Sequence, residues 1–410
     1  MRRSRSTRLT QRGAAFLTSG AILTAGGVFL GQPDLTRVGI FLLALLGGSA
    51  ALGRLRPVRM TVQRVLEPPQ VAVDEPARVR LSLRNDAPRR SPLLAAHDEV
   101  GPALGENPQF LVTPIGVGES AQIDYPLRPR ARGLHPLGPV WLWLRDPFGL
   151  TCVTAAASGT AALLVTPRIH PLTAYRPLGA AQGSEGTLAH RIALRGEEDQ
   201  AIRDYREGDD LRRIHWPATA RTGSLMVRQE DRPAQRRSVI LFDNRRAAHS
   251  GSSFEWFVSM AASIGAHAAG AGYAVHLLTP DVTVDARVRT DDALPDLVAT
   301  LARIEPSRDD VFPSVLHAAS SSASAGGLLV ALVSGLDEST TRSLAALRQH
   351  GSLALALVHL PDTGAASITQ ARRTLATLGA AGWLTAAIDG RRSPAQVWEA
   401  LTHGRVGERS

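Results

Sequence analysis

Three hydrophobic patterns follow one another along the chain of 410 residues. Residues 14–31 and 38–53 are two uncharged, mostly apolar runs joined by a short polar loop. From Val58 to about Pro171, apolar and polar residues alternate, and Pro and Gly interrupt the runs. Beyond Arg237, short continuous apolar runs alternate with stretches of helical spacing. Because a period of two is typical of strands and a period near 3.6 of helices, the patterns predict a multidomain protein.

The two apolar runs predict a transmembrane hairpin. Each is close to the minimum length for a helix that crosses a hydrocarbon core of about 30 Å. Five arginines precede the first run, and Arg54, Arg56 and Arg59 follow the second. Since positive charge accumulates on the cytoplasmic side, we expect residues 1–56 to be an Arg-rich tail and two helices of a multi-pass cell-membrane protein, with both termini cytoplasmic. A cleaved signal peptide is the alternative, and the second apolar run that follows at once argues against it.

The alternating region, residues 57–171, is predicted to be an antiparallel β-sandwich-like domain. Short strands separated by Pro and Gly turns are typical of such domains. The clearest alternating runs are residues 58–62, 79–83 and 123–127. Trp141 and Trp143 are two residues apart and therefore share one face of a strand. We expect that face to pack on the core, in preference to the alternative of a ligand-stacking platform.

Residues 238–410 are predicted to form an α/β domain of Rossmann type. Continuous apolar strands alternating with helices indicate a mostly parallel sheet that is covered on both faces. Ligands of such folds bind at the carboxyl ends of strands, which makes Asp243, after the first strand, a position of interest. The predicted strands are residues 238–242, 273–279, 327–334, 353–360 and 384–388, and the predicted helices are 254–270, 294–304, 339–350, 368–378 and 393–401.

Composition excludes several kinds of chemistry. All 46 basic residues are arginine, so the chain has no Walker A lysine, Schiff-base lysine or lysine general base. Hydrolysis of ATP by a P-loop within this chain is therefore excluded. Cys152 is the single cysteine, which excludes intrachain disulfides and cysteine-based zinc sites.

The position of the charge argues against a nucleic-acid partner. Residues 1–64 contain ten arginines and one acidic residue, Asp34, which accounts for the whole net charge of +9. The remaining residues are neutral overall, so the basic surface that nucleic acids require is missing from them.

Residues 172–237 are a linker with a dense group of charged and aromatic residues. A Gly-Asp-Asp turn at Gly208 is expected to cap a short helix over residues 211–215. Three interpretations remain open: self-satisfying ion pairs, acid–base hydrolysis by His215 with Asp209 or Asp210, and a binding surface formed by arginine and tryptophan. The signature residues of the linker are Arg203, Tyr205, Gly208, Asp209, Asp210, Arg212, Ile214, His215, Trp216 and Arg221.

The arrangement around Asp243 argues against a bound metal. A carboxylate at the end of a strand can bind a divalent cation together with oxygen atoms of the next loop. Here Arg245 and Arg246 follow, and their charges would pair with the aspartate and repel a cation. We therefore expect a structural role for Asp243 and no cofactor.

The string from Arg203 to Arg221, Arg-x-Tyr-x-x-Gly-Asp-Asp-x-Arg-x-Ile-His-Trp-x-x-x-Ala-Arg, resembles the signature of the family called domain of unknown function 58. The resemblance extends to the order of the parts: an N-terminal hairpin, a β region with an Asp-Pro-Phe-Gly motif at Asp146, the signature, and an α/β half. It implies that this half is similar to a von Willebrand factor A domain. The Asp-x-Ser-x-Ser metal pattern of such domains is broken here, because Arg245 and Ala247 replace both serines.

The resemblance also implies partners. Members of this family are often linked to MoxR-type AAA+ ATPases and to transglutaminase-like membrane proteins, and no catalytic residue carries over from them. We therefore expect a membrane-anchored cytoplasmic interaction or scaffold protein, not an enzyme, that works with such an ATPase in assembling or maturing envelope or protein complexes. A hydrolase that uses His215 with Asp209 or Asp210 is the alternative.

Overall fold

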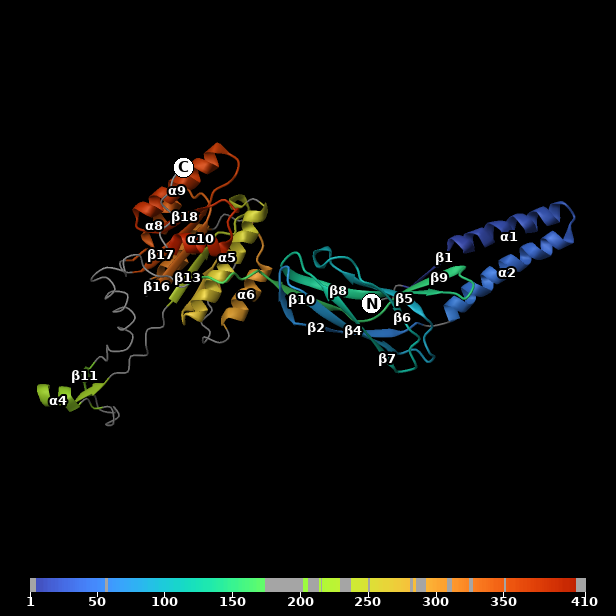
Figure 1. Cartoon of the computed structure of the whole chain (residues 1–410), viewed down its shortest axis with the longest axis horizontal. Helices are drawn as coiled ribbons and strands as arrows, with labels where there is room; N and C mark the ends of the chain where they lie inside the picture. The colour runs from blue at the N-terminus through green and yellow to red at the C-terminus, as the bar shows by residue number, and fades with distance from the viewer. Residues whose placement is uncertain are drawn as a thin grey trace. The chain divides into compact units, whose positions relative to one another are not determined.

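The computed structural model describes residues 5–55, 58–173, 202–205, 214, 216–228, 237–249, 251–280, 283–284, 293–307, 312–323, 327–349 and 352–402. They belong to two compact units, Met1–Thr166 and Pro167–Ser410. The first unit contains a helical pair and β-sheets, and the second contains helices and a mostly parallel sheet (Figure 1). The predicted multidomain α/β organisation with several sheets is confirmed.

The N-terminal helices α1 (Gln11–Phe29) and α2 (Pro33–Leu55) pack against each other. A side chain at Gly20, Gly27 or Gly39 would overlap the facing helix, so these glycines allow the close approach. By length and apolar composition, the part of α2 over Pro33–Gly53 is a candidate membrane span, and little of it is buried by protein. The predicted crossing by the first apolar run stays a prediction.

A strand that the hydrophobic pattern did not predict ties the helices to the larger β-sheet of the first unit. β1 (Arg5–Leu9) pairs antiparallel with β9 (Thr151–Ala156) immediately before α1 begins. Thr10 caps α1 by accepting a hydrogen bond from Gly13 N at 3.1 Å, and Thr10 N donates to Leu150 O at 3.0 Å. Helix α1 is therefore bonded at its first turn to the β8–β9 connection of the sheet.

The β region consists of a seven-stranded and a three-stranded sheet with a shared apolar core. The pairing is antiparallel except between β10 and β3, which run parallel. The three-stranded sheet contains β2 (Met60–Glu67), β4 (Ala77–Asn85) and β7 (Ser120–Leu127). The larger sheet adds β3 (Gln70–Ala72), β5 (Leu94–Val100), β6 (Gln109–Val112), β8 (Gly133–Arg145) and β10 (Ala161–Thr166) to β1 and β9.

The expected packing of Trp141 and Trp143 on the core is wrong. Their neighbours in β8 at positions 140, 142 and 144 are buried, so the tryptophans lie on the opposite face, where they are half-buried. Trp143 stacks on His97 with ring centroids 4.6 Å apart, and Trp141 Nε1 donates to Glu99 Oε2 at 2.8 Å. The polar tip of an indole requires such a partner, and the apolar core offers none.

A buried ion pair joins the two sheets of the β region. Arg64 of β2 donates from Nε and Nη2 to the two carboxylate oxygens of Asp98 of β5, at 2.9 and 2.7 Å. Both side chains are almost inaccessible to solvent. Tyr125 of β7 donates its hydroxyl to the same carboxylate at 2.6 Å, and burial followed by this contact raises the pKa of Tyr125 far above its usual value. Arg64 Nη1 also donates to Gly159 O at 2.8 Å, so each of the three buried polar side chains has hydrogen-bond partners within the protein.

We expect Arg64→Met to destabilise the first unit by about 3–5 kcal/mol, because it leaves the Asp98 carboxylate buried without its cation. Arg80→Met is the matched control: Arg80 is also on the three-stranded sheet, but its ion pair with Glu67 is exposed. That substitution should lower the free energy of unfolding by less than about 1 kcal/mol. Urea unfolding of the detergent-solubilised chain, followed by tryptophan fluorescence, measures both. Equal losses for the two variants would contradict a dominant buried pair.

The second unit contains a six-stranded sheet in the order β15-β14-β13-β16-β17-β18. All neighbours run parallel except the edge strand β15, which is antiparallel. The strands are β13 (Arg237–Phe242), β14 (Ala274–Leu278), β15 (Thr283–Val284), β16 (Gly327–Val333), β17 (Leu353–His359) and β18 (Leu384–Ile388).

Helices cover both faces of this sheet (Figure 1). One core contains residues of α5 (Gly251–Gly270), α6 (Ala293–Arg303) and α10 (Pro394–Thr402). The other contains residues of α7 (Phe312–Ala323), α8 (Glu338–Ala346) and α9 (Ala365–Ala380). Successive residues of each buried strand enter opposite cores, which explains why these strands read as continuous apolar runs.

Each predicted strand and helix of residues 238–410 corresponds to an element of the structure, with ends shifted by a few residues. The prediction missed α7 and β15. The second half of α7 is rich in serine, which has a low helix propensity and favours turns. Its apolar first turn, with Phe312 fully buried, is held by tertiary packing.

Candidate functional site

The strand order of the second unit reverses direction between β13 and β16. Numbered along the chain, its strands lie in the order 3-2-1-4-5-6, the doubly wound arrangement in which ligands bind beside the strands where the order reverses. Asp243 follows β13, and Ser334 follows the neighbouring strand β16. The structure therefore brings these two side chains together at the switch point.

An arginine two residues along the chain neutralises Asp243. Arg245 donates from Nε to Oδ1 at 2.8 Å and from Nη2 to Oδ2 at 2.9 Å. Ser334 Oγ donates to Oδ2 at 3.4 Å, and the carboxylate is fully buried. The guanidinium of Arg245 also lies over the ring of Phe312 on α7, 5.6 Å from its centroid. A bidentate pair of this kind is a strong, directional contact.

This contact determines the chemistry open to the switch point. A divalent cation at Asp243 would have to displace a bidentate guanidinium from a buried site. Among the residues that the structure describes, no three His, Cys, Asp or Glu side chains are grouped so that they could hold a metal ion. The absence of a cation at Asp243 stays a prediction. Its physical reason is that the carboxylate already faces the positive charge of Arg245.

Removing the Arg245 guanidinium should therefore lower the stability of the second unit. We expect Arg245→Gln to destabilise the second unit by about 3–5 kcal/mol, because it leaves a buried carboxylate without its charged partner. Arg246→Gln, at the exposed next position, is the control and should stay within about 0.5 kcal/mol of the parent chain. Urea titration in detergent gives both values. A small loss at position 245 would mean that water or a bound cation replaces the guanidinium.

Two histidines complete this buried edge, and the hydrophobic pattern did not single out either. The Nε2 atom of His249 donates to the backbone oxygen of Asp243, and its ring lies between Phe254 and Phe257, with both ring centroids 5.3 Å away. His359, the last residue of β17, stacks on it with centroids 6.2 Å apart. More than one hundred residues of sequence separate the two, so their contact exists only in the folded chain.

Both imidazoles are expected to be neutral in the folded protein. Burial lowers the pKa of His249 below its usual value of 6.5 and outweighs the opposing hydrogen bond and charge of Asp243. Burial also lowers the pKa of His359, again against a backbone hydrogen bond that raises it. The unfolded chain therefore binds more protons than the folded chain in the pH range just below 6.5.

We expect the stability of the second unit to be fully present above pH 6.5 and to fall as the pH drops below that value towards the lowered folded-state pKa values. Each histidine contributes a slope of at most about 1.4 kcal/mol per pH unit. His249→Gln should reduce the slope while keeping an N–H donor, and His317→Gln, at an exposed position of α7, controls for the substitution itself. Unfolding midpoints measured across this pH range test the expectation, and unchanged slopes would contradict it.

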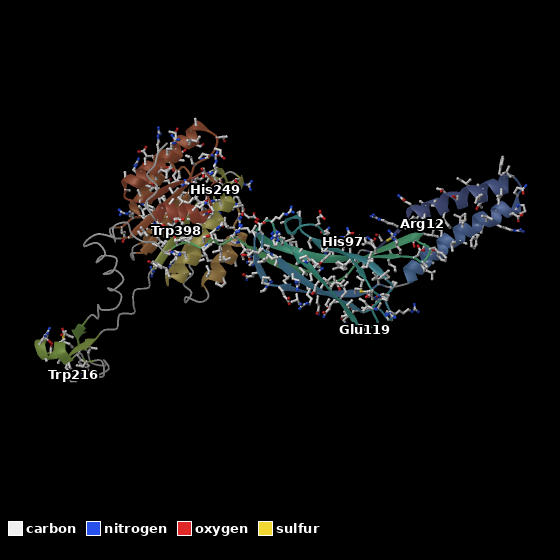
Figure 2. The ribbon with its side chains drawn as sticks, in the orientation of Figure 1. Arg12, His97, Glu119, Trp216, His249 and Trp398 are labelled. Carbon is white, nitrogen blue, oxygen red and sulfur yellow. The ribbon has the colours of Figure 1, made fainter. Side chains whose placement is uncertain are left out.

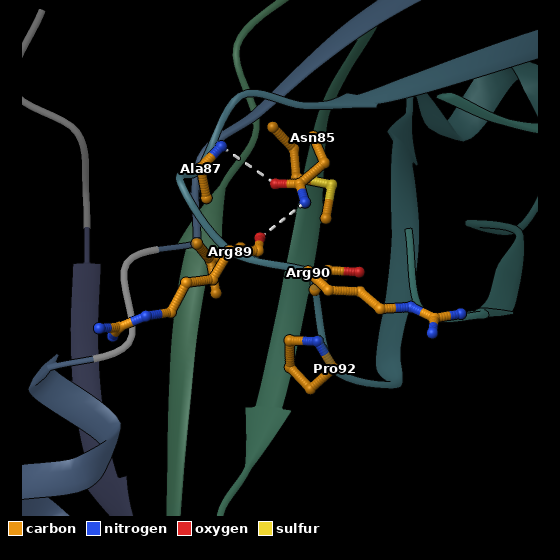
Figure 3. Close-up of a pocket in the computed structure, with 8 residues that line it drawn as sticks. Asn85, Ala87, Arg89, Arg90 and Pro92 are labelled. Atoms are coloured by element: carbon orange, nitrogen blue, oxygen red, sulfur yellow. Dashed lines mark hydrogen bonds between the residues drawn. The ribbon is translucent and has the colours of Figure 1, made fainter. Parts of the chain in front are cut away.

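A pocket of about 560 Å³ lies in the β region beside the start of β2. Buried Asn85 shapes its loop: the amide oxygen accepts from Ala87 N at 3.0 Å, and Nδ2 donates to Arg89 O at 2.9 Å. The side chains of Arg89 and Arg90 project in different directions (Figure 3). Because the two guanidinium groups do not converge, the pocket does not present a specific anion site.

The described part of the signature segment is a small module of its own. β11 (Ile202–Asp204) pairs antiparallel with β12 (Met226–Arg228), and α4 (Trp216–Thr222) lies between them in sequence. Tyr205 N donates to Leu225 O at 2.8 Å, and Thr219 Oγ1 of α4 accepts from Met226 N at 3.0 Å. These bonds fasten the helix to the hairpin.

The module exposes a tryptophan. Trp216, at the first position of α4 (Figure 2), is 66% exposed. Arg221, in the last turn of the helix, is also exposed. Tyr205 and Ile214 are half-buried instead, and Ile214 forms a β-bridge with Val227. The predicted short helix over residues 211–215 is therefore wrong at Ile214, because the helix begins at Trp216 and Ile214 pairs with a strand.

Comparison with protein families matches residues 201–374 to the model described as "Protein of unknown function DUF58". Over this range the chain is similar to the DUF58 family. The match begins at the signature module and ends within α9, so it includes Trp216, Asp243 and both buried histidines. The predicted family is confirmed, and its description names no activity. Comparison with curated proteins gives no match.

Three solved structures show weak likenesses. The CARDB domain of the PF1109 protein from Pyrococcus furiosus is 12% identical, with 27% of this chain and 94% of that chain covered and a TM-score of 0.19. The alkylpurine DNA glycosylase AlkC of Pseudomonas fluorescens is 14% identical, with 33% of this chain and 39% of that chain covered and a TM-score of 0.18. The sporulation control protein Spo0M of Bacillus subtilis is 12% identical, with 36% of this chain and 58% of that chain covered and a TM-score of 0.16. Scores this low carry no argument about this chain.

Half of the DUF58 signature residues lie outside the part of the chain that the structure describes. They are Gly208, Asp209, Asp210, Arg212 and His215, and Arg203 is described only through its backbone pairing with Val227. The expected clustering of His215 with the two aspartates therefore stays a prediction, as does the hydrolase alternative built on it. Of the described signature residues, Trp216 and Arg221 are the pair available to a partner.

Proposed function

We propose that this DUF58 chain is a membrane-anchored cytoplasmic interaction protein. Its partner is an AAA+ ATPase of MoxR type, and the two act in the assembly or maturation of envelope or protein complexes. The observation that carries the proposal is the exposure of Trp216 on a helix that hydrogen bonds hold to the β11–β12 hairpin. A large exposed aromatic side chain and an exposed arginine on the same short helix have the composition of an interface hot spot.

The anchor is the helical pair. The first helix, α1, takes the chain through the bilayer and the apolar α2 returns it, so that both termini and both folded units are cytoplasmic. The arginines before α1 and after α2 support this orientation. A transglutaminase-like membrane protein is the second expected partner. Nucleic acid is not, because the net charge beyond residue 64 is zero.

The α/β half serves as a docking scaffold of von Willebrand factor A type. The doubly wound strand order and the antiparallel edge strand support this assignment. Because Arg245 occupies the carboxylate at the switch point, partner binding relies on exposed side chains and not on a shared metal ion.

The test is capture of the ATPase from detergent-solubilised membranes. We expect Trp216→Ala and Arg221→Ala each to weaken binding, the tryptophan variant by about 30-fold, which corresponds to a hot-spot loss of about 2 kcal/mol. Trp216→Phe should retain part of the affinity. Arg342→Ala is the control, because Arg342 is an exposed helical arginine outside the signature. Recovery of no ATPase with the parent chain, or equal recovery with all variants, would refute the proposal.

A further inference from the structure

The turn between β8 and β9 is built as a rigid unit. It contains the Asp146-Pro147-Phe148-Gly149 sequence. The carboxylate of Asp146 accepts hydrogen bonds from Phe148 N at 2.8 Å, from Thr151 Oγ1 at 2.8 Å and from Thr151 N. Gly149 adopts a positive φ of 68°, and its N–H donates to Asp146 O at 3.0 Å. The turn residues between Asp146 and Thr151 are therefore held in one conformation.

This turn packs on both N-terminal helices. Thr10 at the start of α1 donates from Oγ1 to Gly149 O at 2.6 Å. Gly13 lies so close to the Leu150 carbonyl that a side chain at position 13 would overlap it. On α2, Gly53 faces Val153 of β9. The same turn thus contacts the first turn of α1 and the last turns of α2.

The contact with α2 places the turn at the end of the apolar span. Leu52 and Gly53 of α2 line a small groove together with Pro147 and Asp146 of the turn. Leu52 lies inside the candidate span, Pro33–Gly53. A residue next to Pro147 therefore lies at the level where the apolar helix ends.

Phe148 is that residue, and its ring is 53% exposed. A single exposed apolar side chain on a soluble surface needs no explanation. Here two exposed arginines accompany it: Arg145 precedes the turn, and Arg12 of α1 reaches towards Gly149 (Figure 2). An aromatic ring with cations beside the end of an apolar helix has the composition of a membrane–water interface.

We propose that the β8–β9 turn is a further membrane contact of the chain, with the cytoplasmic leaflet of an anionic phospholipid bilayer as its partner. The Phe148 ring inserts at the boundary between headgroups and acyl chains, and Arg12 and Arg145 contact headgroup phosphates. The inference rests on the proposed anchoring through α2. Because the turn is bonded to Thr10 and continuous with β8 and β9, its insertion holds the β region against the bilayer and prevents it from swinging on α2.

Depth measurement with spin labels tests the proposal on the full chain in vesicles. Cys152→Ser removes the single cysteine, and Phe148→Cys or Leu134→Cys then introduces one labelling site. The two positions are matched: Leu134 is 54% exposed and lies at the other end of β8, roughly 35 Å along the strand. In vesicles of phosphatidylglycerol and phosphatidylcholine, we expect the label at 148 to be accessible to oxygen and protected from a water-soluble nickel chelate. The label at 134 should be accessible to the nickel chelate and less accessible to oxygen than the label at 148.

The outcomes separate this inference from the proposed anchoring. A label at 148 that is as accessible to the nickel chelate as the label at 134, in a chain that resists alkaline extraction from the vesicles, overturns the inference and leaves the anchoring intact. Protection of position 148 from both reagents also overturns it, since protein would then cover the turn. A chain that does not stay with the vesicles refutes the anchoring and the inference together.

A charge variant provides an independent measurement that needs no spin label. Arg12→Gln with Arg145→Gln changes two exposed side chains, so the fold should be retained and circular dichroism can verify it. In the same lipid mixture, tryptophan introduced by Phe148→Trp should be quenched by brominated acyl chains, and less so in the charge variant. Quenching that is equal with and without the two arginines overturns their assigned contact with phosphate.

Discussion

The pairing of Asp243 with Arg245 is the constraint on which the α/β half depends. A carboxylate at the end of a central strand is fully buried, and a guanidinium two residues later binds both of its oxygens. The same loop carries His249, whose ring bonds the backbone oxygen of Asp243 and packs among phenylalanines. The Asp243 carboxylate, at the edge of the sheet where doubly wound proteins usually bind ligands, is thus already bonded within the protein.

The first unit also contains a buried pair of an arginine and an aspartate. Arg64 and Asp98 join its two sheets through a buried pair that Tyr125 completes. Its contact with the helices depends instead on backbone and close packing, with Thr10 and Gly13 against the β8–β9 turn. The result is a β region whose end is bonded to the start of α1 and packs on α2, the helix that contains the candidate membrane span.

Local pattern predicted most of the elements, and its failures have physical reasons. The apolar strands and amphipathic helices beyond Ser238 follow from periodicity, because burial selects for it. The strand β1 and the helix α7 were missed because their formation depends on partners distant in sequence, β9 for one and the sheet for the other. Trp141 and Trp143 share a face as predicted, but alternation alone does not state which face meets the core. The buried histidines of the switch point left no local signal at all.

The sequence by itself determined the family, the charge distribution, the absence of lysine chemistry and the order of apolar, alternating and helical parts, since these are properties of residues and of their near neighbours. It also placed Arg245 two residues after Asp243, so that an ion pair between them could be predicted without the fold. Only the tertiary structure decided that this pair is buried at a topological switch point, that His359 joins His249 there, and that Pro147 lines a groove with Leu52 of α2. Each of these depends on contacts between segments far apart in the chain, whose free energy is set by packing and desolvation and not by local pattern.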